Sequence, residues 1–93
     1  MVKVTKKSGK AWVTFSFSPT DNVENVEILG EWNEWKPESM KKKKNGEYSI
    51  TKIIKTNADY QFGYRVDGNR WLVETDCQIV PSPFNSNNSL LKI

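Results

Sequence analysis

The chain has 93 residues and a formal net charge of +3, from 14 basic and 11 acidic side chains. This length suits a single domain with a modest core, which four Trp, three Tyr and four Phe can largely fill. There is no histidine and only one cysteine, which excludes an intrachain disulfide and argues against a zinc site or histidine-based catalysis. We therefore expect a protein that is not an enzyme and that has no metal or other cofactor.

No stretch approaches the roughly 18 consecutive apolar residues of a membrane span. Residues 1–7 are basic, but the apolar segment of a signal peptide does not follow them. The single cysteine fits a reducing compartment. These features predict a cytoplasmic protein without a membrane partner.

The charged residues occur in runs. Lysines cluster over residues 3–10 and again over 41–44, and five glutamates lie between them, over residues 24–38. A nucleic-acid-binding domain normally has a basic excess on one face. Here the overall excess is slight and there are only two arginines, so we do not expect nucleic acid as a partner.

Short strands are predicted along most of the chain. The polar residues 1–9 are a candidate disordered segment, which leaves residues 10–93 as the single domain. Residues 10–17 alternate between apolar and polar, as expected of a strand with one face toward a core. Residues 26–28 alternate again and lead into Gly30.

Asn45-Gly46 is the strongest hairpin signal in the chain. It predicts a turn that joins a strand over residues 40–44 to a strand over residues 47–53. The apolar alternation breaks at residues 52–54, which indicates a bulge or the end of the strand.

The second half of the chain contains the strand with the clearest apolar face. Its inward-facing residues are Tyr60, Phe62, Tyr64 and Val66. A turn follows over residues 67–69, residues 81–88 form an irregular loop, and residues 89–93 form a last strand. Five to seven short strands without a helical period predict an all-β sandwich.

Five sequence motifs, in the same order, resemble those of the N-terminal early-set domains of isoamylases and branching enzymes. They are an opening hydrophobic strand, a second strand ending in Gly-Glu-Trp-Asn-Glu-Trp, a Gly-Glu-Tyr segment preceded by Met, a Val-Asp-Gly turn followed by Trp, and a closing Asn-Ser-hydrophobic strand. The motifs lie at residues 13–19, 26–35, 40–48, 64–71 and 88–93. No single motif is specific, but the ordered set is.

These domains are carbohydrate-binding modules of the glycogen-binding type, which also occur in the β-subunit of AMP-activated protein kinase. The resemblance implies an immunoglobulin-like, early-set β-sandwich. It also implies binding of α-1,4-linked glucans, such as glycogen, starch or maltooligosaccharides, without hydrolysis. The implied partners are an α-glucan and, as a candidate, a glycogen-metabolising enzyme.

The resemblance also assigns roles to individual residues. Trp35 and Trp71 match the two sugar-stacking tryptophans of the family. Asn88 matches the asparagine that bonds sugar hydroxyls, and Phe84 matches a hydrophobic loop residue placed against the glucan. Ser86 is a candidate for a minor polar contact in the same loop.

The chain departs from the family pattern at Gly63, where kinase-type members have a lysine that contacts the sugar. Gln61 and Arg65 lie two residues to either side on the same strand face and are candidate replacements. Trp32 stands where the family has Phe and is expected in the core. Because there is one extra residue before Trp71, the sequence does not predict the angle of its ring.

Alternative interpretations remain open at this point. Trp35 and Trp71 could seal the edge of the sandwich without binding sugar, in a protein-interaction or regulatory domain that has lost the sugar site. The same aromatic residues could also combine with the basic runs to bind single-stranded nucleic acid.

Overall fold

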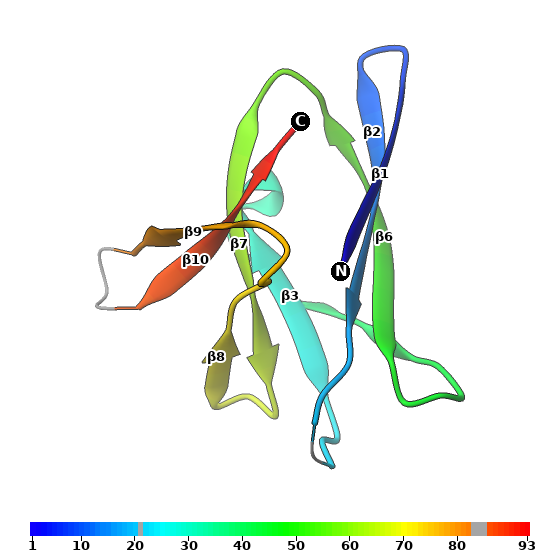
Figure 1. Ribbon diagram of the computed structural model, residues 1–93, viewed down its shortest axis with the longest axis vertical. Coiled ribbons are helices and arrows are strands. Elements are labelled where there is room, and N and C mark those ends of the chain that lie inside the picture. The colour runs from blue at the N-terminus through cyan, green and yellow to red at the C-terminus, as the bar shows by residue number, and fades with distance from the viewer. Residues whose placement is uncertain (21, 83–85) are drawn as a thin grey trace.

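The protein forms two facing antiparallel sheets, shown in a computed structural model that describes residues 1–20, 22–82 and 86–93 (Figure 1). The described residues contain ten strands and one short 3-10 helix, η1 (Glu31–Asn33). The expected all-β, immunoglobulin-like sandwich is confirmed. Nowhere in the described part of the chain is there a helix long and apolar enough to cross a membrane.

The first sheet, here called the β2 sheet, has the strand order β1-β2-β6-β5. Its strands are β1 (Val2–Lys7), β2 (Lys10–Phe17), β6 (Tyr48–Lys55) and β5 (Lys41–Lys42). The β2–β6 pairing runs without interruption from Lys10 opposite Lys55 to Phe17 opposite Tyr48. The bulge or strand end expected at residues 52–54 is therefore wrong. The apolar pattern breaks there because Ile53 faces solvent while Ile54 is buried.

The expectation of a disordered segment over residues 1–9 differs from the structure. Val2–Lys7 form β1, which pairs with β2 along its whole length. Val2 and Val4 lie opposite the buried residues Phe15 and Val13, so this strand extends the apolar side of the sheet. A turn at Ser8 and Gly9, both with positive φ, joins β1 to β2.

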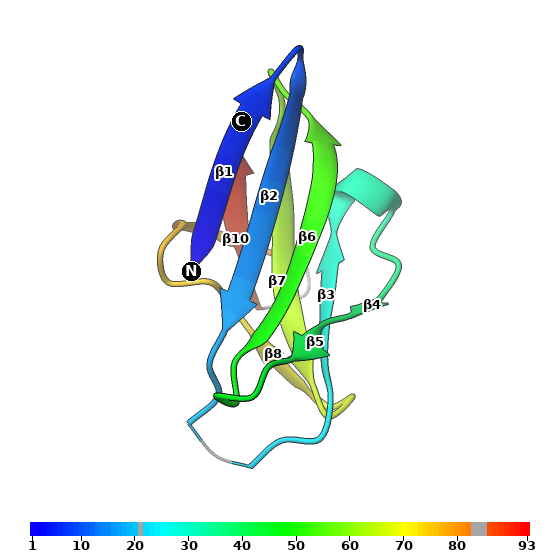
Figure 2. The ribbon, with the colours of Figure 1, turned by 90° about the vertical axis from the view of Figure 1, so that its right-hand side faces the viewer.

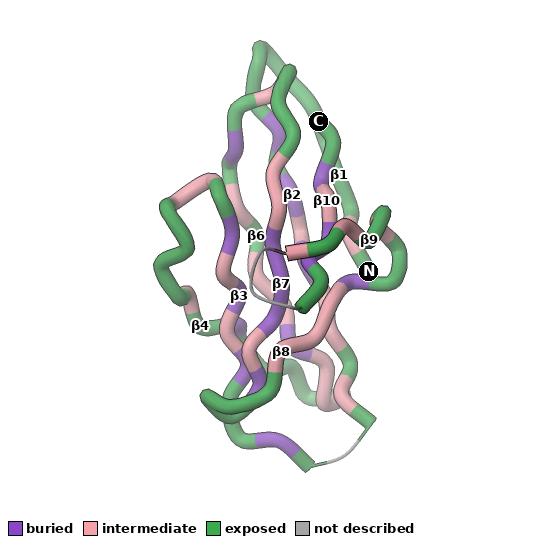
Figure 3. The backbone as a smooth tube through the Cα atoms, turned by 90° about the vertical axis from the view of Figure 1, so that its left-hand side faces the viewer, coloured by how far each residue is buried: buried purple, intermediate pink, exposed green. Residues whose placement is uncertain are grey.

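The second sheet, here called the β7 sheet, has the strand order β4-β3-β7-β10-β9, and β8 also pairs with β7. Its strands are β3 (Val26–Gly30), β4 (Glu38–Ser39), β7 (Asp59–Val66), β8 (Arg70–Leu72), β9 (Gln78–Pro81) and β10 (Asn87–Lys92). One edge of β7 is shared by two strands, because β10 pairs with residues 59–62 and β8 with residues 64–66. Gly63 lies between these two pairings. The strands β7, β8 and β10 lie on the side of the molecule that faces the viewer in Figure 3.

The core fills the space between the sheets with the alternate residues that the sequence pattern predicts. Phe15 of β2 meets Phe62 of β7 at a ring-centroid distance of 5.0 Å. Trp32, from η1, stacks on Phe15 at 5.2 Å. A Cβ atom on Gly30 would lie 2.5 Å from the Trp32 ring, so the absence of a side chain there makes room for it. Trp32 is thus a core-packing residue, as expected.

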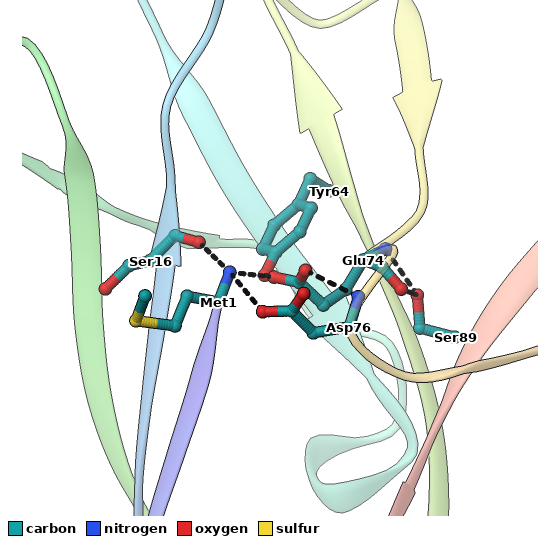
Figure 4. Close-up of polar contacts among 6 residues, drawn as sticks. All are labelled: Met1, Ser16, Tyr64, Glu74, Asp76 and Ser89. Carbon is teal, nitrogen blue, oxygen red and sulfur yellow. Dashed lines mark hydrogen bonds and ion pairs between the residues drawn. The ribbon is translucent and has the colours of Figure 1, made fainter.

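Glu74 connects the two sheets through buried polar contacts (Figure 4). Its carboxylate accepts hydrogen bonds from the Tyr64 hydroxyl at 2.8 Å and from the Met1 amine. It also accepts one from the backbone N–H of Asp76, and the backbone N–H of Glu74 donates to the Ser89 hydroxyl. Burial by itself raises the pKa of the Glu74 carboxyl, but these donors lower the pKa further than burial raises it.

Replacing Glu74 with Gln should lower the free energy of unfolding at neutral pH by about 1–3 kcal/mol, because the charge-assisted hydrogen bonds are lost. The pKa of Glu74 is lower in the folded state than its ordinary value of 4.5. Its stabilising effect should therefore be complete above pH 4.5 and should disappear as the pH falls through the folded-state pKa. Urea denaturation of both proteins across this pH range measures the difference. A difference that stays constant from neutral to acid pH would contradict this prediction.

Candidate functional site

Trp35 is presented by a tight loop between β3 and β4. Its backbone N–H donates to the Gly30 carbonyl at 2.9 Å. Glu34 and Trp35 both have left-handed backbone conformations, with φ of 63° and 64°, a conformation that bulky residues rarely adopt and that marks a functional constraint in many sites. The Trp35 side chain remains 37% exposed.

The Trp71 ring is held in place by the backbone around it. Trp71 lies in β8, and its indole N–H donates to the Asn87 carbonyl at the start of β10, at 2.9 Å. A Cβ atom on Gly63 would lie 2.2 Å from this ring. The ring therefore crosses β7 over a residue without a side chain and joins β8 to β10.

The two indole rings form a tilted pair. Their centroids are 6.3 Å apart and their planes meet at 48°. Trp35 comes from the β3–β4 loop and Trp71 from β8, so only the folded sheet brings them together. The extra residue before Trp71 does not prevent this pairing.

The ring pair forms part of a hollow of about 480 Å³ on the outer side of the β7 sheet. The described residues that line it are Leu29, Glu31, Trp35, Gln61, Trp71, Ser82, Ser86 and Asn88. Within it, the Asn88 side-chain amide donates to Gln61 Oε1 at 3.0 Å. The Gln61 backbone N–H donates to Glu31 Oε1 at 2.6 Å. Aromatic faces and hydrogen-bonding groups thus converge on one open site.

The hollow brings together most of the residues that the sequence singles out. Trp35, Trp71, Asn88 and Gln61 line it, as does Ser86. Phe84 lies outside the described residues.

Arg65 occupies a different position from the one its sequence spacing suggests. Its guanidinium donates to Glu27, opposite it on β3, through Nε at 3.0 Å and a terminal nitrogen at 2.8 Å. It does not line the hollow described above. The expected replacement of the family lysine by Arg65 therefore receives no support, and Trp71 covers the position that a side chain at residue 63 would use.

Three lining residues, Leu29, Glu31 and Ser82, do not appear among the residues chosen from the sequence. The sequence pattern could have identified Leu29. Val26 and Ile28 are buried, so alternation along the strand places residue 29 on the outer face. In the structure Leu29 lies opposite Gly63. Glu31 reaches the hollow because η1 begins there, and no alternation pattern predicts this helix.

The hollow carries almost no charge, in contrast to the two lysine runs. Of the described residues that line it, Glu31 alone carries a formal charge. The lysine runs over residues 3–10 and 41–44 lie largely in the β2 sheet. The structure therefore separates the aromatic pair from the basic runs. The hollow is chemically suited to a neutral ligand with flat apolar faces and hydroxyl groups.

The dependence of Trp71 on Gly63 can be measured directly. Gly63 does not have a positive φ, so Gly63→Ala should cost about 1–3 kcal/mol of stability through overpacking against the indole and not through backbone strain. In a Trp71→Ala background the same change should be neutral or slightly stabilising. A double-mutant cycle in urea measures this coupling. An equal cost in both backgrounds would show that the ring does not constrain residue 63.

In comparisons with known proteins, no protein-family model matches this chain and no curated protein matches it significantly.

Proposed function

We propose that this domain binds neutral α-1,4-linked glucan, such as glycogen, starch or maltooligosaccharides, without hydrolysing it. The observation that carries the proposal is the shared hollow of Trp35 and Trp71, with their centroids 6.3 Å apart. The order of sequence motifs supports the same conclusion independently of the geometry. Such a module can bring a glycogen-metabolising enzyme to its polymer, and we propose such an enzyme as the partner.

The geometry of the rings suits a curved sugar chain. Each pyranose has an apolar C–H face that can lie flat on an indole, and successive units of an α-1,4 chain turn relative to each other. Two rings inclined at 48° can meet two such faces in succession. Stacking one sugar removes apolar area from water that is worth about 1–3 kcal/mol. A short oligomer should therefore bind with a dissociation constant on the order of micromolar to millimolar.

The polar groups of the hollow can set the register of the chain. Gln61 and Asn88 already bond each other, so their relative orientation is defined before a ligand arrives. Their remaining amide groups and the Glu31 carboxylate can bond sugar hydroxyls. Water supplies equivalent bonds to a free sugar, so these contacts contribute more to selectivity than to affinity.

The number of carboxylates that line the hollow favours binding of a glucan over its hydrolysis. Most glycosidases use a pair of carboxyl groups on either side of the scissile bond. Of the described lining residues, Glu31 provides a single carboxylate, which already accepts a backbone N–H. An open hollow also leaves water in contact with the ligand. A binding module is therefore the function that this site supports best.

Replacing Trp35 with Ala tests the proposal. We expect the wild-type chain to be retarded in polyacrylamide that contains glycogen, and Trp35→Ala to lose most of this retardation. The matched control is Trp12→Ala, because Trp12 is 38% exposed and Trp35 37%. Trp12 lies on the β2 sheet, so the control should migrate like the wild type.

Two results would contradict the proposal. One is a wild-type chain that glycogen does not retard while maltoheptaose leaves its tryptophan fluorescence unchanged. The other is retardation that Trp35→Ala and Trp71→Ala leave intact. A stable fold with no response to either glucan would favour the protein-interaction or regulatory domain.

The amide pair allows a finer measurement. Gln61→Ala and Asn88→Ala should each weaken binding of maltoheptaose by about 5- to 10-fold, because each removes a neutral hydrogen bond worth about 1 kcal/mol. The double variant should lose less than the sum, since the two side chains bond each other. Isothermal titration gives the affinities, and thermal unfolding checks that the buried Asn88 position tolerates the change. Fully additive losses would show that the two amides act separately.

A further inference from the structure

The two sheets differ in charge, because the strands of the β7 sheet carry three basic and three acidic side chains. The four strands of the β2 sheet contain eight lysines and no aspartate or glutamate. Since the whole chain carries +3, the remainder is acidic overall. The small net charge of the whole chain therefore hides one strongly basic sheet, because acidic residues outside the strands offset its lysines.

The strand register arranges the outer face of the β2 sheet in rows. Ala11, Val13 and Phe15 are buried, so the residues between them on β2 face outward. β1, β2 and β6 lie side by side in Figure 2, and their outward residues align across the strands. The first row is Lys7, Lys10 and Lys55; the second is Thr5, Trp12 and Ile53; the third is Lys3, Thr14 and Thr51.

The stability of the sheet does not explain why lysines occupy all three positions of the first row. Like charges directly opposite one another destabilise a sheet. Lysines on an edge strand prevent pairing between molecules, which accounts for Lys7 on β1. Lys10 and Lys55 lie on β2 and β6, the interior strands of this sheet. In the described part of the chain, the ion pairs join other residues and neutralise none of these three lysines.

The second row is apolar at its centre and exposed. Trp12 is 38% exposed and its neighbour Ile53 is 59% exposed. The third row offers the hydroxyl groups of Thr14 and Thr51, which hydrogen-bond each other at 2.9 Å, and a further lysine, Lys3, on the edge strand. The face therefore presents a row of three lysines, then an aromatic ring with an aliphatic neighbour, then two hydroxyls with Lys3 beside them.

We propose that this outer face of the β2 sheet binds single-stranded nucleic acid. Phosphates would lie along the Lys7, Lys10 and Lys55 row, a base would stack on Trp12, and the base edge would meet Thr14 or Thr51. Adjacent rows are two residues apart along a strand, about 6.5 Å. This is comparable to the separation of backbone and base in one nucleotide.

The combination of a lysine row, an exposed stacking ring and hydroxyl groups favours a polynucleotide over other anionic partners. A polynucleotide combines phosphates for the lysines, flat bases for Trp12 and hydrogen-bonding base edges for Thr14 and Thr51. An acidic protein or an anionic membrane has no base to stack on Trp12. The face lies on the opposite sheet from the glucan hollow, so this proposal does not depend on the proposed function.

Anisotropy of a labelled oligothymidylate of about 15 nucleotides, titrated with the full chain, tests the proposal. Contacts with three phosphates predict that affinity falls about 20-fold when salt rises from about 50 to 200 mM. The triple variant Lys7→Gln, Lys10→Gln, Lys55→Gln should lose most of this salt dependence. It should fold at least as well as the wild type, because it removes like-charge repulsion. Trp12→Thr should weaken binding about tenfold through lost stacking.

Matched variants separate this site from the hollow. Lys36→Gln removes an exposed lysine outside the β2 sheet, and Trp35→Ala removes a ring from the hollow; neither should change oligonucleotide binding by more than about twofold. Absence of binding at low salt, or binding that the triple variant leaves unchanged, would overturn the proposal. Equal or tighter binding of poly-L-glutamate, phosphatidylserine vesicles or a DNA duplex would overturn it in favour of another anionic partner. None of these outcomes bears on retardation by glycogen.

Discussion

The Trp71 indole can cross β7 only because residue 63 has no side chain. A Cβ atom there would lie 2.2 Å from the ring, and steric overlap of this size must displace one of the two groups. With the ring in place, its N–H reaches the Asn87 carbonyl and joins β8 to β10. The same ring forms one wall of the hollow and faces Trp35. The Trp71 link between β8 and β10 and the aromatic pair therefore depend on a single contact.

This contact also changes the meaning of Gly63. The sequence resemblance alone would make glycine at this position the loss of a lysine that contacts sugar. In the structure, it is the condition for the placement of Trp71. The polar groups of the site come instead from Gln61 and Asn88 on neighbouring strands and from Glu31. Arg65, which the strand alternation places on the same face, pairs with Glu27.

The two outer faces of the sandwich have different chemistry. The β7 sheet presents two tilted indoles and neutral amides, which suits a ligand with hydroxyl groups and flat apolar faces. The β2 sheet presents lysines in register beside one exposed tryptophan, which suits a ligand with negative charge. Trp12 and Trp35 are almost equally exposed, yet their neighbours give them different proposed partners. The same residue type thus has a different proposed role on each side of the sandwich.

Alternation and turn residues were sufficient to predict the class of fold, because one buried face per strand leaves a period of two in the sequence. The order of motifs was sufficient to single out Trp35, Trp71 and Asn88, and strand alternation around Gly63 added Gln61; the structure places these four residues together. Glu31 could not be foreseen, since its place depends on where β3 ends and η1 begins. The pairing of β1, the unbroken register through Ile53 and the row of lysines across three strands were decided only by the tertiary structure. Contacts between strands join residues far apart in the chain, and no local pattern records which strands become neighbours.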